Sequence, residues 1–194
     1  MGLGKQAKTL SKGQTDAVLG YLAKTRWPKR NRVIFLLSAK AGLRAKEIAG
    51  LTWMMVNDSQ GEIGRTLCLL DSASKGKSGR WIPLSDEVRE ALIEYRDEVN
   101  LKVGEHVVRT ERAMSTSPQA IVNMFQRWYQ HLGFVGCSSH SGRRTFITNA
   151  ARKISTVGGS LRDVQLLAGH SNLRTTQRYI EPNPEAQVRI VELV

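Results

Sequence analysis

The sequence predicts a mainly α-helical domain with one small antiparallel β-sheet, an α+β fold. Most of the 194 residues fall into segments where apolar side chains recur with helical spacing, several of them behind capping residues. Only two short segments, on either side of a polar turn that contains glycine, have the composition of strands. The apolar content of 41% and the absence of internal repeats favour a single well-buried core.

The first quarter of the chain reads as helical. Ser11 and Gln14 form the pattern of a capping box at the start of a helix. Pro28 suits the first turn of the next helix, which is apolar and ends at Gly42. Gly50 closes a short third helix. We therefore expect helices over residues 11–24, 28–42 and 45–49.

The middle of the chain changes to strand character. Segments 62–70 and 80–84 are short and apolar, and the run 72–79 between them is a polar turn with two glycines. These segments predict an antiparallel hairpin. Beyond it we expect a loop over 103–116 and helices over 85–99, 117–132, 141–153, 160–168, 173–179 and 185–194.

The chain is strongly basic, with a net charge of +12 and a pI of about 10.2. Residues 1–50 carry 11 basic and 2 acidic side chains, whereas residues 51–100 carry 6 and 9. This uneven distribution predicts one cationic face. Such an excess of charge is typical of proteins that bind nucleic acid, with an anionic membrane as the alternative. No stretch approaches the roughly 18 apolar residues of a membrane span.

Cys68 and Cys137 are the two cysteines of the chain. They form neither a disulfide framework nor a CxxC metal pair, which favours a reducing, intracellular setting. The N-terminal segment lacks the apolar run of a secretory signal. We expect a cytoplasmic protein that associates with the nucleoid, without membrane attachment, metal or cofactor.

Two candidate functional segments lie in the first half of the chain, at a helix end and a turn, where function concentrates. Arg44 follows a glycine and begins a helix; taken alone, it fits a surface arginine paired with Glu47. Lys75 lies in the hairpin turn, where a lysine can reach into a groove as a flexible point charge or remain solvated. Lys77 is an equal candidate for that role.

Two further segments lie near the C-terminus. His140 and Arg143 are three positions apart, so on a helix they share a face and can approach one anion. The planar guanidinium suits a phosphate, and histidine titrates near neutrality. His170 and Tyr179 are nine residues apart across a predicted helix–turn–helix; taken alone, each fits a structural role.

Together these residues resemble the tyrosine recombinases, also called the phage integrase family. Segments 41–53, 74–84, 139–146 and 167–179 are similar to the family's arginine, lysine-hairpin, His-x-x-Arg and Gly-His…Tyr motifs. Each motif is weak alone, but their common order makes the resemblance specific. It covers the chain from about Ser11 to the C-terminus. It implies a basic lead-in over 1–10, a catalytic domain over 11–181 and a tail over 182–194.

The resemblance implies a site-specific recombinase or integrase that cleaves and rejoins DNA. Tyr179 would attack a DNA phosphate, form a 3′-phosphotyrosyl link and release a 5′-hydroxyl. A free tyrosine has a pKa of about 10, so a base or cationic surroundings must help, and His140 is the candidate base. Lys75 would protonate the leaving oxygen. The phosphotyrosine conserves the ester bond, so ATP is not needed, and the chain lacks a GxxxxGK[ST] phosphate loop.

The remaining implied residues handle charge. Arg44 and Arg143 would neutralise the non-bridging oxygens in the transition state without a metal. His170 would hydrogen-bond the phosphate or orient its neighbours. The implied catalytic set is Arg44, Lys75, His140, Arg143, His170 and Tyr179. The candidates for contact with DNA are Lys77, Arg80, Arg144 and Arg174.

The resemblance also implies double-stranded DNA as partner, a homo-oligomer on DNA that becomes a tetramer in synapsis, and a bacterial, phage or mobile-element origin. Accessory DNA-bending proteins stay open. Residues 182–194 either pass to a neighbouring subunit or cap their own core. About ten residues precede the predicted domain, so an N-terminal DNA-clamp domain is either removed or naturally absent. Gly142 replaces the family's usual leucine, so packing there must differ. The alternative functions are a type IB topoisomerase, a non-catalytic DNA-binding regulator and a basic structural protein.

Overall fold

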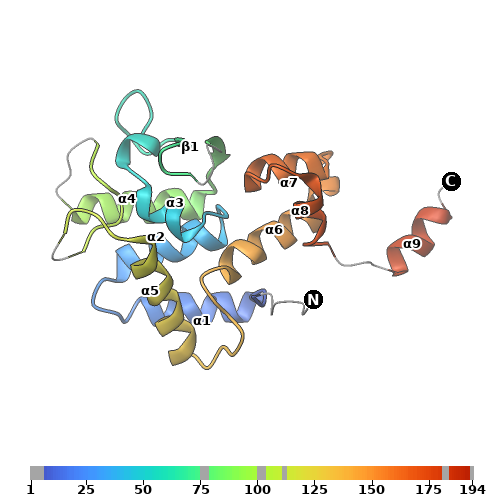
Figure 1. Ribbon diagram of the computed structural model, residues 1–194, viewed down its shortest axis with the longest axis horizontal. Helices are drawn as coiled ribbons and strands as arrows, with labels where there is room; N and C mark the ends of the chain where they lie inside the picture. The colour runs from blue at the N-terminus through green and yellow to red at the C-terminus, as the bar shows by residue number, and fades with distance from the viewer. Residues whose placement is uncertain (1–6, 75–78, 100–103, 111–112, 181–183, 193–194) are drawn as a thin grey trace.

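The computed structural model describes residues 7–74, 79–99, 104–110, 113–180 and 184–192. The predicted Lys75 and Lys77 lie outside these residues. The described part is mostly helical, with two strands, and so confirms the predicted fold class (Figure 1). The α-helices are α1 (Lys12–Leu22), α2 (Pro28–Ala39), α3 (Ala45–Gly50), α4 (Asp86–Glu98), α5 (Pro118–His131), α6 (Ser141–Lys153), α7 (Leu161–Ala168), α8 (Leu173–Gln177) and α9 (Pro184–Val191). Two 3-10 turns that the sequence does not predict, η1 (Trp53–Met55) and η2 (Ile154–Val157), follow α3 and α6.

The two strands, β1 (Thr66–Leu69) and β2 (Arg80–Pro83), pair antiparallel with Leu67 opposite Ile82. The first strand is shorter than the predicted 62–70. The carbonyls of Ile63 and Gly64 accept hydrogen bonds from the Arg89 side chain on α4, at 3.0 and 3.1 Å, instead of joining the ladder. The sheet is therefore a small hairpin attached to α4.

The described apolar side chains form two clusters of very different size. The larger one takes residues from α1 to α5, η1 and both strands, with Phe35, Trp53 and Phe125 at its centre. The smaller one consists of Ile147, Val164 and Ala168, on α6 and α7, with Tyr179 packed against it. In Figure 1 the second region, α6 to α8, lies beside the first, and α6 connects the two.

Helix α6 packs closely on α2 at Gly142. A Cβ added at Gly142 would lie 2.6 Å from the Ser38 hydroxyl oxygen and 3.2 Å from the Ala39 nitrogen. The sequence predicts that packing differs where glycine replaces leucine, and this stays a prediction; in this chain α2 fills the space beside Gly142. Glycine allows the backbones of α2 and α6 to approach directly.

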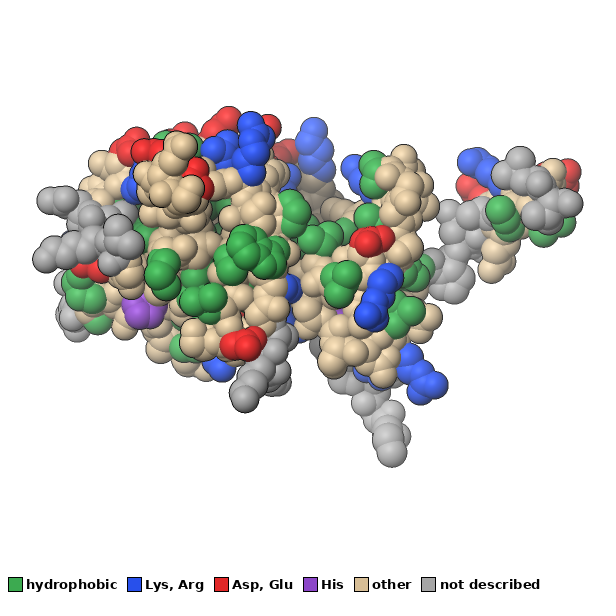
Figure 2. Space-filling view, turned by 90° about the horizontal axis from the view of Figure 1, so that it is seen from above, with side chains coloured by type: hydrophobic (Ala, Val, Ile, Leu, Met, Phe, Trp, Pro, Cys, Tyr) green, Lys and Arg blue, Asp and Glu red, His purple; other side chains and the backbone are tan. Residues whose placement is uncertain are grey.

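The final helix, α9, stands apart from the rest of the molecule (Figure 1). Three of its apolar side chains are exposed: Val188, Ile190 and Val191. In Figure 2 this helix lies at the right edge, with hydrophobic side chains in view. None of the helices in the described ranges is both long enough and apolar enough to cross a membrane.

Candidate active site

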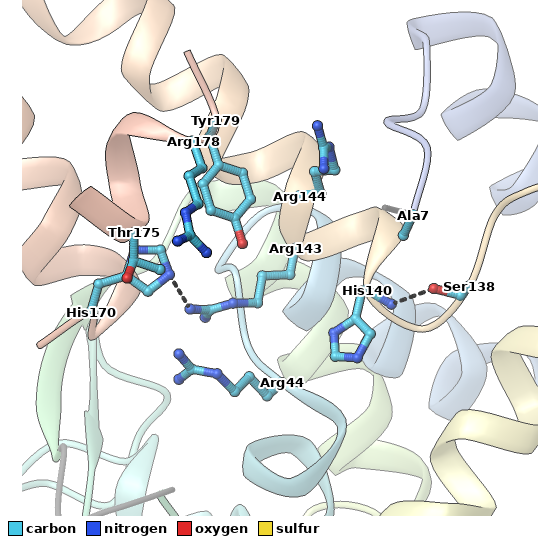
Figure 3. Close-up of a pocket in the computed structure, with 10 residues that line it drawn as sticks. All are labelled: Ala7, Arg44, Ser138, His140, Arg143, Arg144, His170, Thr175, Arg178 and Tyr179. Atoms are coloured by element: carbon cyan, nitrogen blue, oxygen red, sulfur yellow. Dashed lines mark hydrogen bonds between the residues drawn. The ribbon is translucent and has the colours of Figure 1, made fainter. Parts of the chain in front are cut away.

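A pocket of about 490 Å³ lies between the two regions, and Figure 3 shows its lining. The larger region contributes Arg44, which precedes α3. The smaller region contributes Arg143 from α6, His170 after α7 and Tyr179 after α8. The described residues that line the pocket are Ala7, Arg44, Ser138, His140, Arg143, Arg144, His170, Thr175, Arg178 and Tyr179. Every predicted catalytic residue within the described part of the chain therefore lines one pocket.

Arg143 occupies the centre of the site and is 4% exposed. One terminal nitrogen donates to the Gly42 carbonyl; the other donates to the Ala168 carbonyl at 2.6 Å and contacts His170 at 3.1 Å. Burial, with the neighbouring charge of Arg44, lowers the pKa of Arg143 to about 10, so it stays cationic at neutral pH. A guanidinium has five N–H donors, and these contacts within the described chain use three, so two remain for an anion.

His170 is held as a neutral imidazole. Burial, reinforced by the charges of Arg143 and Arg44, lowers the pKa of His170 to about 4. Arg143 can only donate, so Nε2 of His170 must accept. The proton therefore sits on Nδ1, which donates to the Thr176 hydroxyl at 3.0 Å. The neutral ring of His170 therefore links the Arg143 guanidinium to the Thr176 hydroxyl.

Arg44 is paired with Glu47, as its simplest interpretation from the sequence suggests, but the pair is not on the surface. Glu47 is fully buried, and its carboxylate accepts from the Arg44 side chain at 2.8 Å and from the Arg44 backbone at 2.9 Å. Arg44 itself keeps a side-chain exposure of 24% and reaches the pocket. One carboxylate therefore orients this guanidinium and leaves part of it open to solvent.

Tyr179 lies partly buried above these cations. Its ring stacks on the His170 ring with centroids 5.6 Å apart, and the Arg144 guanidinium lies over it at 5.7 Å. Figure 3 shows its hydroxyl directed toward Arg143. A phenol among cationic groups is chemically suited to attack an anionic ester, because the guanidiniums can neutralise the negative charge of the ester.

His140 is the N-cap residue of α6 and is exposed at the edge of the pocket. Its backbone N–H donates to the Ser138 hydroxyl at 3.3 Å. The N-terminus of α6 therefore faces the pocket, and its partial positive charge favours an anion there. No set of three or more His, Cys, Asp or Glu side chains comes together as a metal site in the described ranges.

Comparison with known proteins identifies the family. The family model described as "Phage integrase family" matches residues 8–186. The chain belongs to the phage integrase family. It is 31% identical over 182 residues to tyrosine recombinase XerA of Thermococcus kodakarensis, and 29% identical over 164 residues to tyrosine recombinase XerC of Brucella suis. These alignments cover 92% and 82% of this chain, but only 59% and 49% of the relatives, so the chain spans about half the length of these relatives.

Solved structures of this family share the fold. The Tn1549 transposon integrase, in complex with a circular intermediate DNA, superposes with a TM-score of 0.77 at 18% identity; the match covers 99% of this chain and 67% of the integrase chain. The XerA recombinase crystal structure gives a TM-score of 0.70 at 22% identity, covering 95% and 64%. The resemblance predicted from the sequence motifs is thus confirmed at the level of family and fold.

The residues predicted to contact DNA differ in where they lie in the structure of this phage integrase family member. Arg144 lines the pocket, whereas Arg174 is exposed on α8 outside the pocket lining. Arg80 lies in the interior with a side-chain exposure of 8% and binds the Glu47 carboxylate. This placement runs against a role for Arg80 in DNA contact, since its guanidinium is already bonded inside the protein.

Some residues of the site have no predicted role. Arg178, Thr175 and Ser138 line the pocket, and Thr176 bonds His170 from beneath. Arg178 directly precedes Tyr179, so adjacency to the nucleophile was an available signal. Thr176 carried no comparable signal, because a threonine on a short helix has many ordinary roles.

Proposed function

We propose that this chain carries the active site of a site-specific DNA recombinase that cleaves and rejoins DNA through a 3′-phosphotyrosyl link. The observation that carries the proposal is the convergence of Tyr179 with Arg44 and Arg143 in one pocket. The tyrosine supplies a nucleophile, and the two guanidiniums supply the charge that a phosphodiester needs in its transition state.

The charge of the pocket supports a phosphate ligand. Of its ten described lining residues, four are arginines, two are histidines and none is acidic. Arg143 keeps N–H donors for a ligand while its other donors are fixed to the protein. Such preorganised donors stabilise developing negative charge without reorganisation during the reaction.

The proposed reaction balances without an energy source. The Tyr179 hydroxyl oxygen bonds to phosphorus as its proton passes to a base, for which His140 at the pocket edge is our candidate. The bond from phosphorus to the 5′-oxygen breaks, and that oxygen takes a proton, for which we assign Lys75 as donor. One phosphate ester replaces another, so attack by a 5′-hydroxyl reverses the step and reseals the strand. His170 orients Arg143 throughout.

We also infer the partners and organisation of the protein. Double-stranded DNA is the proposed substrate, contacted by Lys77, Arg144 and Arg174, and a homotetramer is the proposed synaptic assembly. Residues 11–181 would form the catalytic unit and residues 182–194 an exchanged tail. The exposed apolar side chains of α9 support this exchange, since Val188 and Val191 are 65% and 68% exposed and lack a cover within the described chain. DNA relaxation and non-catalytic regulation have no observation in their favour.

The nucleophile is tested by trapping. We expect the wild-type chain to form an SDS-resistant adduct with a nicked suicide duplex, which loses its 5′-hydroxyl fragment and cannot reseal. Tyr179→Phe should abolish the adduct and leave DNA affinity within about twofold, because the ring and its stacking on His170 are retained. Peptide mapping should place the adduct on Tyr179.

Tyr21→Phe is the matched control, because Tyr21 stacks on His131, outside the pocket lining. It should form the adduct normally. A persisting adduct in Tyr179→Phe, or an adduct mapped to another residue, would refute the assignment. Relaxation of supercoiled plasmids irrespective of sequence would instead indicate a topoisomerase.

A further inference from the structure

Arg80 is the first residue of β2, and its side chain is directed inward. Its Nε donates to the Leu167 carbonyl at 2.8 Å, and its two terminal nitrogens donate to the two carboxylate oxygens of Glu47 at 3.0 and 3.1 Å. The side chain is 8% exposed, and each of the three guanidinium nitrogens donates a hydrogen bond within the protein. Arg80 thereby links the hairpin to the end of α7 and to α3.

The turn before His170 packs closely against the Arg80 side chain. A Cβ added at Gly169 would lie 2.8 Å from a terminal nitrogen of Arg80 and 3.0 Å from its guanidinium carbon. Gly169 also has a φ of +59°, a conformation that favours glycine. The absence of a side chain at Gly169 therefore lets Arg80 lie directly beneath this turn.

Glu47 is shared between two guanidiniums. One carboxylate oxygen accepts from both Arg44, at 2.8 Å, and Arg80, at 3.0 Å. Burial raises the pKa of Glu47, but the hydrogen bond and charge of Arg80, together with Arg44, hold it below its usual value. The buried carboxylate is thus charged, and Arg80 provides two of its side-chain hydrogen bonds against one from Arg44.

We propose that Arg80 is a positioning residue that occupies the Glu47 carboxylate and so keeps Arg44 available to the phosphate. With Arg80 present, one negative charge is divided between two cations, and Arg44 retains positive charge toward the pocket. Without it, the buried carboxylate has Arg44 as its sole side-chain cation in the described chain, pairs with it fully and cancels its charge. This inference rests on the proposed function, because it names the ligand of Arg44 as a DNA phosphate.

The decisive comparison is a cycle of Arg80→Met, Glu47→Gln and the double variant. Arg80→Met should reduce single-turnover adduct formation on the nicked duplex about 100-fold, the effect of losing one preorganised donor. Adding Glu47→Gln should recover at least tenfold of that loss, because the unmatched carboxylate is then removed. Arg80→Lys should lie between wild type and Arg80→Met, since lysine keeps the charge but not the fork.

A second readout does not require cleavage. Inorganic phosphate titrated against the Nε–H NMR signal of Arg44 should bind more weakly to Arg80→Met than to wild type, and affinity should return in the double variant. If the wild type forms no adduct but shows this phosphate pattern, the proposed function fails and the role of Arg80 stands. If the adduct forms but Glu47→Gln gives no recovery by either readout, the role of Arg80 is overturned.

One control variant and two further measurements distinguish this role of Arg80 from other roles. Arg96→Met removes an arginine that pairs with Glu62, outside the pocket lining, and should leave adduct formation and phosphate binding unchanged. If Arg80 contacted DNA directly, Arg80→Met would lose about one phosphate contact. The slope of the logarithm of DNA affinity against the logarithm of salt concentration would then become shallower by about 1. A purely structural role would lower the melting temperature of Arg80→Met and the double variant alike, without recovery; either result contradicts the proposal.

Discussion

The two regions of the molecule are stabilised in different ways. In the described chain, the larger region buries 33 apolar residues in one cluster, whereas the α6–α8 region buries three in its own. Each fully buried large apolar side chain contributes about 1.5–3 kcal/mol, so the larger region can maintain its fold by burial alone. The α6–α8 region cannot, and it depends on its contacts with the larger one.

Several of those contacts are polar, and one of them comes from a residue of the site. Arg143 on α6 donates to the Gly42 carbonyl before α3, and Arg80 on β2 donates to the Leu167 carbonyl on α7. Thr145 on α6 accepts from the Leu10 backbone at 2.7 Å. Arg143, which we propose binds phosphate, therefore also helps to hold the two regions together. Substitutions in the site should therefore affect local stability as well as chemistry.

The largest effect is expected for Arg143→Met. It removes a phosphate donor and leaves the Gly42 and Ala168 carbonyls without their guanidinium partner, at about 1–3 kcal/mol for each buried group. Adduct formation should fall at least 1,000-fold. Hydrogen exchange measured by mass spectrometry should accelerate in α7 and α8 while α2 stays protected.

Leu36→Ala provides the matched comparison, because Leu36 is fully buried in the larger cluster. It should cost about 2–5 kcal/mol and accelerate exchange throughout the molecule. Equal protection of α7 in wild type and Arg143→Met would show that the arginine does not hold the regions together.

Gly142→Ala should have a smaller effect, located where α6 meets α2. Alanine favours a helix over glycine by about 1 kcal/mol. Here, however, its Cβ would lie 2.6 Å from the Ser38 hydroxyl oxygen, and overpacking costs about 1–3 kcal/mol. We expect a lower melting temperature in calorimetry.

Ser38→Ala should rescue much of that loss, because it removes the nearest atom. The Ser38 hydroxyl has no hydrogen-bond partner among the described residues, so its removal alone should be nearly neutral. A Gly142→Ala protein that is more stable than wild type would show that α6 and α2 have room to separate.

Much of this organisation could be predicted from the sequence. Capping patterns such as Ser11 with Gln14, and breakers such as Pro28, act locally, so most helices begin and end within a few residues of prediction. Arg44, His140, Arg143, His170 and Tyr179 were recognised from motif order and do line one pocket. The family could be inferred because these residues are few, polar and fixed in order.

What escaped prediction depends on three-dimensional partners. In the sequence, Arg44 and Arg80 look alike, because each is an arginine near a predicted turn. Only the fold shows that both bind Glu47, with Arg80 in the interior and Arg44 open to the pocket. Arg174 and Arg178 are also hard to tell apart in the sequence, since they are only four residues apart. Of the two, only Arg178 is among the described residues that line the pocket. The burial of Glu47 follows from how α3 packs, which composition does not reveal.

The smallest effect is expected for Thr176→Val, beneath the site. Thr176 is fully buried and accepts the Nδ1 proton of His170, which fixes Nε2 as the acceptor for Arg143. Valine keeps the shape of the threonine side chain but removes that acceptor. The neutral His170 ring then either keeps an unsatisfied Nδ1–H or turns away from Arg143.

A net hydrogen bond is worth about 0.5–1.5 kcal/mol, so Thr176→Val should slow adduct formation about two- to tenfold. Thr176→Ser, which keeps the hydroxyl, should match wild type, and ¹⁵N NMR of the His170 ring should report Nδ1–H in both. An unchanged tautomer and rate in Thr176→Val would mean that the contact with Arg143 is enough to fix the His170 ring without the Thr176 hydroxyl.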